Sequence, residues 1–370
     1  MSTVATASES PRFSISSRNT SRRAREPLSP QTELRSNKIG RPVVAESFSE
    51  QPTNTRPVPV VTNRSAPGEL GQVAAVVVTY NRIEKLPKTL AAVLAQSHAC
   101  EWVVVVNNNS TDGTREYLDS LDEPKLKVLH LDENLGGAGG FEYGMAHGYN
   151  LGADYVWIMD DDCYPEAEAL EVLLRQRHKS SQALRYEVPF ACSLVKFIDG
   201  SLCEMNNPIT TWDWPRAYLM GVNSLLVTEC TFVSVLVPRW AIEEQGLPLG
   251  EYFIWFDDKE YTKRLERHYG AGIIALDSVV VHDMGVNAGV NYRQVDESNV
   301  WKFEKGTRNQ ASYRLRNEGR LSYLLYYRRV ITEMREGEVA TGVKKRIKAA
   351  LNNARSFNPQ PRFPDNPIYQ

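Results

Sequence analysis

Two alternating patterns of apolar residues run through the first half of the chain. Residues 73–78 and 102–106 are continuous valine-rich runs, which is typical of strands buried on both faces of a parallel sheet. Residues 84–96, between them, repeat leucine and valine at the three- and four-residue spacing of one helical face. The order strand, helix, strand predicts the beginning of a doubly wound sheet.

The same alternation continues through about four strand–helix units. It predicts helices over residues 112–121 and 138–150 and strands over residues 127–131 and 155–159. A further β-branched run, SVVVH, occupies residues 278–282. We therefore expect an α/β fold whose doubly wound, mostly parallel sheet is flanked by helices.

The two ends of the chain differ from this central part. Residues 1–68 are rich in Ser, Thr, Arg, Pro and Asn without apolar periodicity, which predicts a disordered tail, either a solvated leader or a segment whose arginines suit an anionic surface. Helical periodicity with many lysines and arginines returns at residues 321–334 and 343–355. We expect an α/β domain over 69–300 and a helical region over 301–370 that contacts a membrane surface or packs on that domain.

Composition narrows the possible classes of protein. The chain has 370 residues, with 43 Lys and Arg against 45 Asp and Glu, so it lacks the positive charge of a dedicated nucleic-acid binder. Five cysteines without a C-x-x-C pair favour reduced thiols. The apolar runs are too short to span a bilayer, and no secretory signal pattern is present. These features predict a cytoplasmic protein without a nucleic-acid partner.

Polar residues follow the predicted strands, where open parallel sheets bind their ligands. They occupy residues 79–82, 107–113, 134–140 and 160–162. The glycine-rich stretch over 134–140 fits neither a dinucleotide fingerprint nor a P-loop. It permits close approach of the backbone to a ligand, or it is a flexible turn. Residues 109–112 are suited to contacting a nucleobase and ribose or to capping a helix.

Asp160, Asp161 and Asp162 are three consecutive carboxylates behind a predicted buried strand. Like charges so close together are unfavourable unless a cation neutralises them. Mg²⁺ or Mn²⁺ is the natural partner, with Asp160 and Asp162 facing one side of an extended turn. The alternative is an acidic turn in which Asp162 caps a helix that begins near Pro165.

A second acidic segment ends the aromatic stretch YFIWF. Partial burial there raises a carboxyl pKa toward that of a useful base, and we assign this role to Asp258, next to Asp257. The alternatives for Asp258 are a helix cap or an ion pair with Lys259 or Arg264. Trp255 either packs in the core or against a sugar face.

The motifs VVVTYNR, VVNNNSTDGT, NLGGAGG and WIMDDD, in this order, resemble the nucleotide-sugar-binding half of family 2 inverting glycosyltransferases of the GT-A (Rossmann-like) fold. The resemblance covers roughly residues 72–261. With the triple aspartate, the segment YFIWFDDKEY and the later His282, the chain looks most like bacterial galactofuranosyltransferases of cell-wall galactan synthesis. One departure is Asn107, where many members of the family have Asp.

The resemblance implies inverting transfer of galactofuranose from UDP-galactofuranose to a saccharide on polyprenyl diphosphate, at the inner face of the cell membrane. It implies that Asp160, Asp162 and His282 hold Mn²⁺ or Mg²⁺ and that Asp258, with Asp257, is catalytic. Donor contacts are expected at Thr79, Asn81, Arg82, Asn107, Asn109, Asn134, Gly137, Asp161, Trp255 and Arg316. The alternatives are a rhamnosyltransferase or another nucleotide-sugar enzyme of this fold, and a non-catalytic scaffold.

Overall fold

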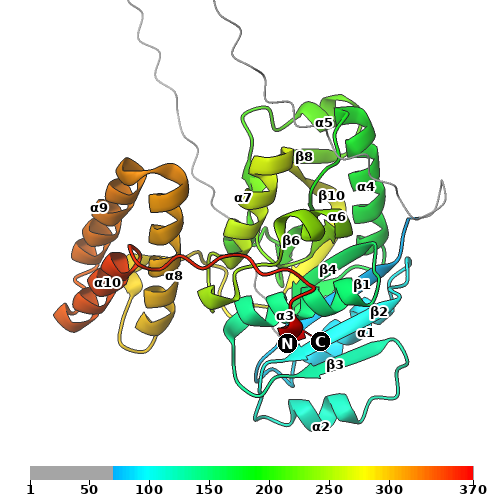
Figure 1. The fold of residues 1–370 in the computed structure, drawn as a ribbon, viewed down its shortest axis with the longest axis horizontal. Helices are drawn as coiled ribbons and strands as arrows, with labels where there is room; N and C mark the ends of the chain where they lie inside the picture. The colour runs from blue at the N-terminus through cyan, green and yellow to red at the C-terminus, as the bar shows by residue number, and fades with distance from the viewer. Residues whose placement is uncertain (1–69, 370) are drawn as a thin grey trace, which may run out of the picture. The chain divides into compact units, whose positions relative to one another are not determined.

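This computed structural model describes residues 70–369, and a mixed sheet lies at the centre of their α/β part (Figure 1). The tail expected over residues 1–68 lies outside the described residues. The strands are β1 (Val73–Thr79), β2 (Trp102–Asn107), β3 (Leu126–His130), β4 (Tyr155–Asp160), β5 (Cys163–Pro165), β6 (Ala191–Phe197), β7 (Ile209–Thr210), β8 (Ser224–Glu229), β9 (Val235–Pro238) and β10 (Gly272–His282). The helices are α1 (Leu86–Leu94), α2 (Thr114–Asp119), α3 (Gly136–Asn150), α4 (Ala169–Leu184), α5 (Arg216–Leu219), α6 (Arg239–Gln245), α7 (Asp257–Tyr269), α8 (Val300–Tyr313), α9 (Arg320–Glu336) and α10 (Thr341–Asn353).

The order of strands brings three predicted strand ends to one edge. The sheet runs β3-β2-β1-β4-β9-β6-β10-β8-β7, and β5 pairs with β10. Strands β1, β2, β3 and β4 are parallel, as are β6 and β10, whereas β9 and β8 are antiparallel to their neighbours. Thr79 pairs with Asn107, and Val78 pairs with Asp160, so these polar ends are adjacent in register.

Helices cover both faces of the sheet, which explains why every residue of β1 is buried. On one face Val73, Ala75 and Val77 pack in a core with α1 and α4. On the other, Val76 and Val78 share a core with α3, α6 and α7. The expected α/β architecture, a mostly parallel sheet flanked by helices, is confirmed.

The glycine-rich stretch differs from the sequence expectation. It is not a loop before a helix at residue 138, because α3 already begins at Gly136. A Cβ on Gly140 would lie 2.4 Å from a methyl carbon of Val78, and one on Gly144 would lie 2.4 Å from a methyl carbon of Val76. These glycines therefore allow α3 to lie closer to β1 than any larger residue would permit.

Helices α8, α9 and α10 enclose a core of their own (Figure 1). Val300, Val330 and Ile347 are fully buried in it. The apolar face of α10 is used for this packing, and its partners there are α8 and α9. Within residues 70–369, no helix combines the length and apolar composition needed to cross a bilayer.

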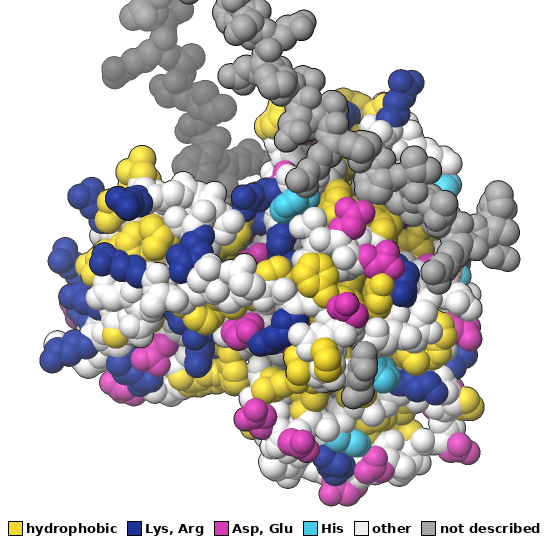
Figure 2. Space-filling view, viewed as in Figure 1, with side chains coloured by type: hydrophobic (Ala, Val, Ile, Leu, Met, Phe, Trp, Pro, Cys, Tyr) yellow, Lys and Arg dark blue, Asp and Glu magenta, His cyan; other side chains and the backbone are white. Residues whose placement is uncertain are grey.

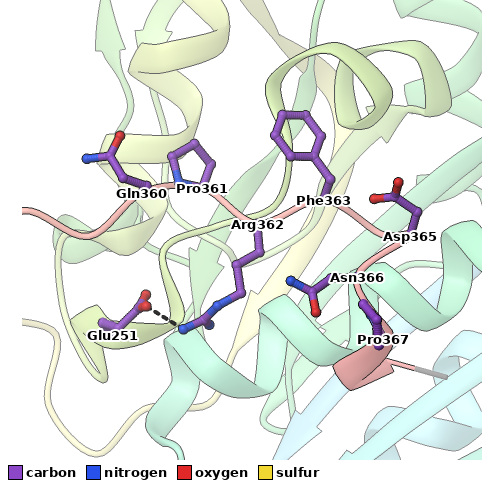
Figure 3. Close-up of a pocket in the computed structure, with 8 residues that line it drawn as sticks. All are labelled: Glu251, Gln360, Pro361, Arg362, Phe363, Asp365, Asn366 and Pro367. Carbon is purple, nitrogen blue, oxygen red and sulfur yellow. Dashed lines mark hydrogen bonds and ion pairs between the residues drawn. The ribbon is translucent and has the colours of Figure 1, made fainter.

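The C-terminal segment returns to the α/β part of the chain. The guanidinium of Arg362 donates to both carboxylate oxygens of Glu142 on α3, at 2.8 and 2.9 Å, and it also pairs with Glu251 (Figure 3). The backbone N–H of Leu247 donates to the carbonyl of Arg362 at 2.8 Å. This segment and Glu251 line an open pocket of about 550 Å³. The carboxylate of Glu142 is thus buried with a charged partner.

Candidate active site

The loops after β1 and β2 are tied together by side chains. The backbone N–H of Thr111 donates to Oδ1 of Asn81 at 2.7 Å, and the N–H of Asn81 donates to Oγ of Ser110 at 2.9 Å. Asn81 and Asn109 are exposed with φ of +53° and +59°, a conformation that asparagine tolerates. Both residues therefore present their side chains at the surface of this sheet edge.

Asn107 and Asn108 use their amides inside the protein. Oδ1 of Asn107 accepts from the N–H of Ser110 at 3.0 Å, and its Nδ2 lies 2.9 Å from Nδ1 of His130. Asn108, which the sequence analysis did not single out, donates to the carbonyl of Gly136 and accepts from the N–H of Leu135, both at 2.8 Å. Asn107 thus shapes its loop, and Asn108 fixes the beginning of α3.

The acidic triplet meets a distant histidine at the end of β10. The Nε2 atom of His282 lies 3.1 Å from Oδ1 of Asp162, although 120 residues separate them. Ligand atoms of Asp160, Asp162, Cys163 and His282 all lie within 4.8 Å of one another. The alternative role of Asp162 as a helix cap near Pro165 is wrong, because residues 163–165 form β5 and α4 begins only at Ala169.

Charges around the triplet explain its pKa pattern. Burial, followed by the negative charges of Asp162 and Asp161, raises the pKa of Asp160 well above its usual value. Burial also raises the pKa of Asp161 to about 7. Burial alone would raise the pKa of Asp162, but the hydrogen bond and charge of His282, with Arg82 and Lys85, lower it. Full ionisation of the triplet is therefore unfavourable in the metal-free protein, and a bound cation would relieve this cost.

The donor atoms suit Mn²⁺ or Mg²⁺. Two carboxylates and an imidazole are ligands that such divalent ions accept in proteins. The Nδ1 atom of His282 lies 2.8 Å from Oδ1 of Asn206, an acceptor, so Nδ1 carries a hydrogen, and Nε2 is the ring atom that faces Asp162. Nδ2 of Asn206 in turn donates to Oγ1 of Thr231 at 2.8 Å. Asn206 follows no strand pattern, so the sequence offered no signal for it.

Asp257 and Asp258 form the first turn of α7. Burial and the charge of Asp258 raise the pKa of Asp257 to about 8. Burial raises the pKa of Asp258 to about 6, and the positive charge of Lys259 limits that rise. The predicted alternatives are wrong: the residue that caps α7 is Phe256, Lys259 pairs with Glu229 and Arg264 pairs with Glu260.

A cavity of about 610 Å³ brings the two acidic groups together. Its lining includes Asp160 and His282 from one group and Asp257 and Asp258 from the other. Of the remaining predicted residues, Gly137 and Trp255 also line it. Tyr326 and Arg329 of α9 contribute to the wall. Metal-ligand candidates and base candidates thus face one space large enough for a sugar.

The other predicted donor residues are outside this lining. Thr79 is buried at the end of β1, and Arg82 donates to Oδ2 of Asp162 at 3.1 Å, so both adjoin the triplet. Oδ1 of Asn134 accepts from the N–H of Gly136 at 2.8 Å.

The sequence analysis expected Arg316 to contact the donor, and the structure gives its side chain other partners. Arg316 lies in the π-helical turn Arg314–Glu318, where its guanidinium donates to Oδ1 of Asn358 and to the carbonyl of Arg355. These partners belong to the C-terminal segment, so the structure does not bring Arg316 to the strand ends.

Comparisons with known proteins agree with this architecture. Residues 74–183 match the family described as Glycosyl transferase family 2. Galactofuranosyltransferase GlfT1 of Mycobacterium tuberculosis (strain H37Rv) is 38% identical over 223 residues, 58% of this chain and 70% of that protein. GlfT1 of Mycolicibacterium smegmatis is 41% identical over 124 residues, 33% of this chain and only 40% of that protein. The crystal structure of GalNAc-T7 with UDP, GalNAc and Mn²⁺ aligns with a TM-score of 0.50 at 14% identity, over 80% of this chain and 60% of that one.

The chain belongs to the family 2 glycosyltransferases and has the GT-A fold. Within that family it is similar to the mycobacterial proteins named GlfT1. Both expectations of the sequence analysis, the family and the fold, are confirmed.

Proposed function

We propose that this chain is an inverting galactofuranosyltransferase of cell-wall galactan synthesis. Its donor would be UDP-galactofuranose, and its acceptor a saccharide carried on polyprenyl diphosphate. Similarity to proteins named galactofuranosyltransferase GlfT1 supports the sugar. The observation that carries the proposal is the shared cavity, where Asp160 and His282 face the same space as Asp258.

In the proposed reaction Asp258 is the base. Its carboxylate takes the proton of the acceptor hydroxyl while that oxygen forms a bond to the anomeric carbon of the donor. The bond from that carbon to UDP breaks in the same displacement, its electron pair leaves with UDP, and the configuration inverts. A carboxyl group with a pKa of about 6 is ionised at neutral pH and is more basic than an ordinary Asp.

Asp160, Asp162 and His282 would hold Mn²⁺ or Mg²⁺, which supplies Lewis-acid stabilisation of a leaving diphosphate. Arg82 is 47% exposed at its side chain, and we propose that it also meets the diphosphate. Donor contacts are further proposed for Thr79, Asn81, Asn107, Asn109, Asn134, Gly137, Asp161 and Trp255.

A donor screen tests the proposal. Purified protein with Mn²⁺ and a synthetic prenyl-linked acceptor is given UDP-galactofuranose, UDP-galactopyranose, UDP-glucose or dTDP-rhamnose, and nucleotide release is measured. Metal-dependent release with the furanose donor, lost in Asp258→Asn, is the expected result. Turnover with dTDP-rhamnose alone would replace the galactan assignment by a rhamnosyltransferase. Absence of turnover and of metal-dependent donor binding would favour a scaffold.

We also propose peripheral contact with the inner face of the cell membrane through the C-terminal helices. Residues 300–369 contain fifteen Lys or Arg against six Asp or Glu. On the face that Figure 2 shows, basic side chains lie over α8–α10 with hydrophobic side chains between them. On α9, Leu321, Leu324 and Leu325 share one helical face and are 71%, 52% and 58% exposed. Apolar side chains among cations suit an anionic lipid surface.

Vesicle flotation tests this contact. We expect the protein to float with phosphatidylglycerol vesicles but not with phosphatidylcholine vesicles, and replacement of Leu321, Leu324 and Leu325 by Gln to abolish flotation. A matched variant with Gln at Leu202 and Leu219, which are exposed elsewhere, should float normally. Equal binding by both variants would dismiss α9 as the contact.

A further inference from the structure

The segment that leads into Asp257 and Asp258 has an unfavourable backbone conformation. Phe253, Trp255 and Phe256 have φ of +67°, +64° and +74°, in the left-handed region that bulky residues avoid. Phe256 directly precedes α7, so these angles set the direction in which the first turn and both carboxyl groups leave the loop. Such a conformation persists only where surrounding contacts hold it.

Asn309 of α8 provides those contacts. Its Nδ2 lies 2.9 Å from the carbonyl oxygens of Tyr252 and Trp255 and 3.2 Å from that of Ile254. An amide has two N–H groups, so three carbonyls share two donors. Oδ1 of Asn309 accepts from Nε and Nη2 of Arg308, at 3.1 and 2.9 Å, which fixes the orientation of the amide. Asn309 is fully buried, so these hydrogen bonds are shielded from solvent.

The same face of α8 also holds the ring of Trp255. A Cβ on Gly306 would lie 2.7 Å from Cε3 of Trp255, so glycine leaves the room that the indole occupies. Phe303 meets this ring edge to face, with centroids 5.0 Å apart. Contacts from α8 therefore restrain both the backbone and a side chain of the segment.

We infer that Asn309 is a positioning residue for Asp258. It acts through the carbonyls of residues 252–255 and does not line the cavity that the substrate would enter. The inference rests on the proposed role of Asp258 as the base. Helix α8 therefore helps to orient Asp258, in addition to forming part of the C-terminal helical core.

Asn309→Ala is the direct test. We expect kcat to fall about 100-fold, because a catalytic group misplaced by about 1 Å loses on that order of rate. The KM for UDP-galactofuranose and the affinity for Mn²⁺, measured by titration with Mn²⁺ alone, should change less than about twofold. Asn299→Ala is the matched control, since the amide of Asn299, the residue that precedes α8, also donates to a backbone carbonyl, that of Gln294, yet contacts no part of the base segment.

Gly306→Ala is a second variant, which tests the inference if Asn309→Ala does not fold. Alanine favours a helix, but here its Cβ would displace Trp255, so kcat should fall without loss of helical content. Gly342→Ala in α10 is its control, because the nearest atom to that Cβ, Oε1 of Glu297, is 3.4 Å away. Equal kcat in the two glycine variants would count against the inference.

Hydrogen exchange separates this inference from the proposed function. Amides of residues 250–260 should exchange faster in Asn309→Ala than in Asn299→Ala, with unchanged exchange in β1 and β4. If the wild-type protein transfers no sugar, the proposed function fails, and the exchange result alone decides whether Asn309 holds the segment. Unchanged exchange, or a kcat within about threefold of the control, overturns the inference. So does a parallel loss of Mn²⁺ affinity and thermal stability, which would indicate a general structural role.

Discussion

Acidification tests the assignment of Asp258 as the base, because its protonated form accepts no proton from the acceptor. With a pKa of about 6, Asp258 is about 97% ionised at pH 7.5 and about 9% at pH 5. We therefore expect kcat to fall about tenfold over that range. An Asp with an ordinary pKa would lose less than about a tenth of its ionisation over the same range.

The assay is initial-rate UDP release at saturating donor, acceptor and Mn²⁺, so that kcat reports the fully bound enzyme. Removal of the positive charge in Lys259→Gln should move the acid limb to higher pH, because Lys259 lowers the pKa of Asp258. Asp257, whose pKa is raised to about 8, titrates with its neighbour, so the pair loses its protons in two steps. A kcat that is unchanged between pH 7.5 and 5, together with near-normal turnover in Asp258→Asn, would refute the reasoning.

Three further predictions concern stability. The metal-free protein should be more stable to urea at pH 5 than at pH 8. Folding raises the pKa values of Asp161 and Asp257, so the protons that stabilise the folded state are lost as pH rises through about 7 and 8. Mn²⁺ should therefore raise the melting temperature more at pH 8 than at pH 5. Gly144→Ala should lower the free energy of unfolding by about 1–3 kcal/mol, because its Cβ would lie 2.4 Å from a valine of β1; a destabilisation below the detection limit of a urea titration would contradict the close packing of α3. Arg362→Ala should lower the free energy of unfolding by about 3 kcal/mol, because the buried carboxylate of Glu142 loses its charged partner. Adding Glu142→Gln should restore most of this stability. If the double variant is no more stable than Arg362→Ala, the ion pair is not the cause of the destabilisation.

Sequence patterns located the candidate site because its residues follow the strands. Valine runs, helical spacing and the polar residues behind them predicted the parallel part of the sheet and the polar residues at the carboxyl ends of its strands, including Asp160 and Asp162. These features are local: burial on both faces dictates the composition of a strand, and the turn after it carries the functional residues. Asp257 and Asp258 follow no strand, and they were found instead from the aromatic stretch before them and from the resemblance to the family.

The contacts of other polar residues could not be predicted from the sequence. Arg316 looked suited to a diphosphate, but the π-helical turn directs its guanidinium to Asn358. Asn107 was expected to contact a base, and its amide also lies against Ser110 and His130, which the sequence did not indicate. In each case the outcome depends on which polar atom lies nearby in space, and the spacing of residues along the chain carries no information about that.

The sequence by itself therefore determined the α/β class, the family and most of the residues at the strand ends, because these depend on local composition and order. The resemblance to the family already implied that His282 joins Asp160 and Asp162, but only the tertiary structure shows that Nε2 of His282 lies 3.1 Å from Oδ1 of Asp162 and that Asn309 of α8 holds the strained segment before Asp258. The physical reason is that hydrogen bonds form between atoms within about 3 Å, and such distances between remote segments exist only after the sheet and the C-terminal helices have packed.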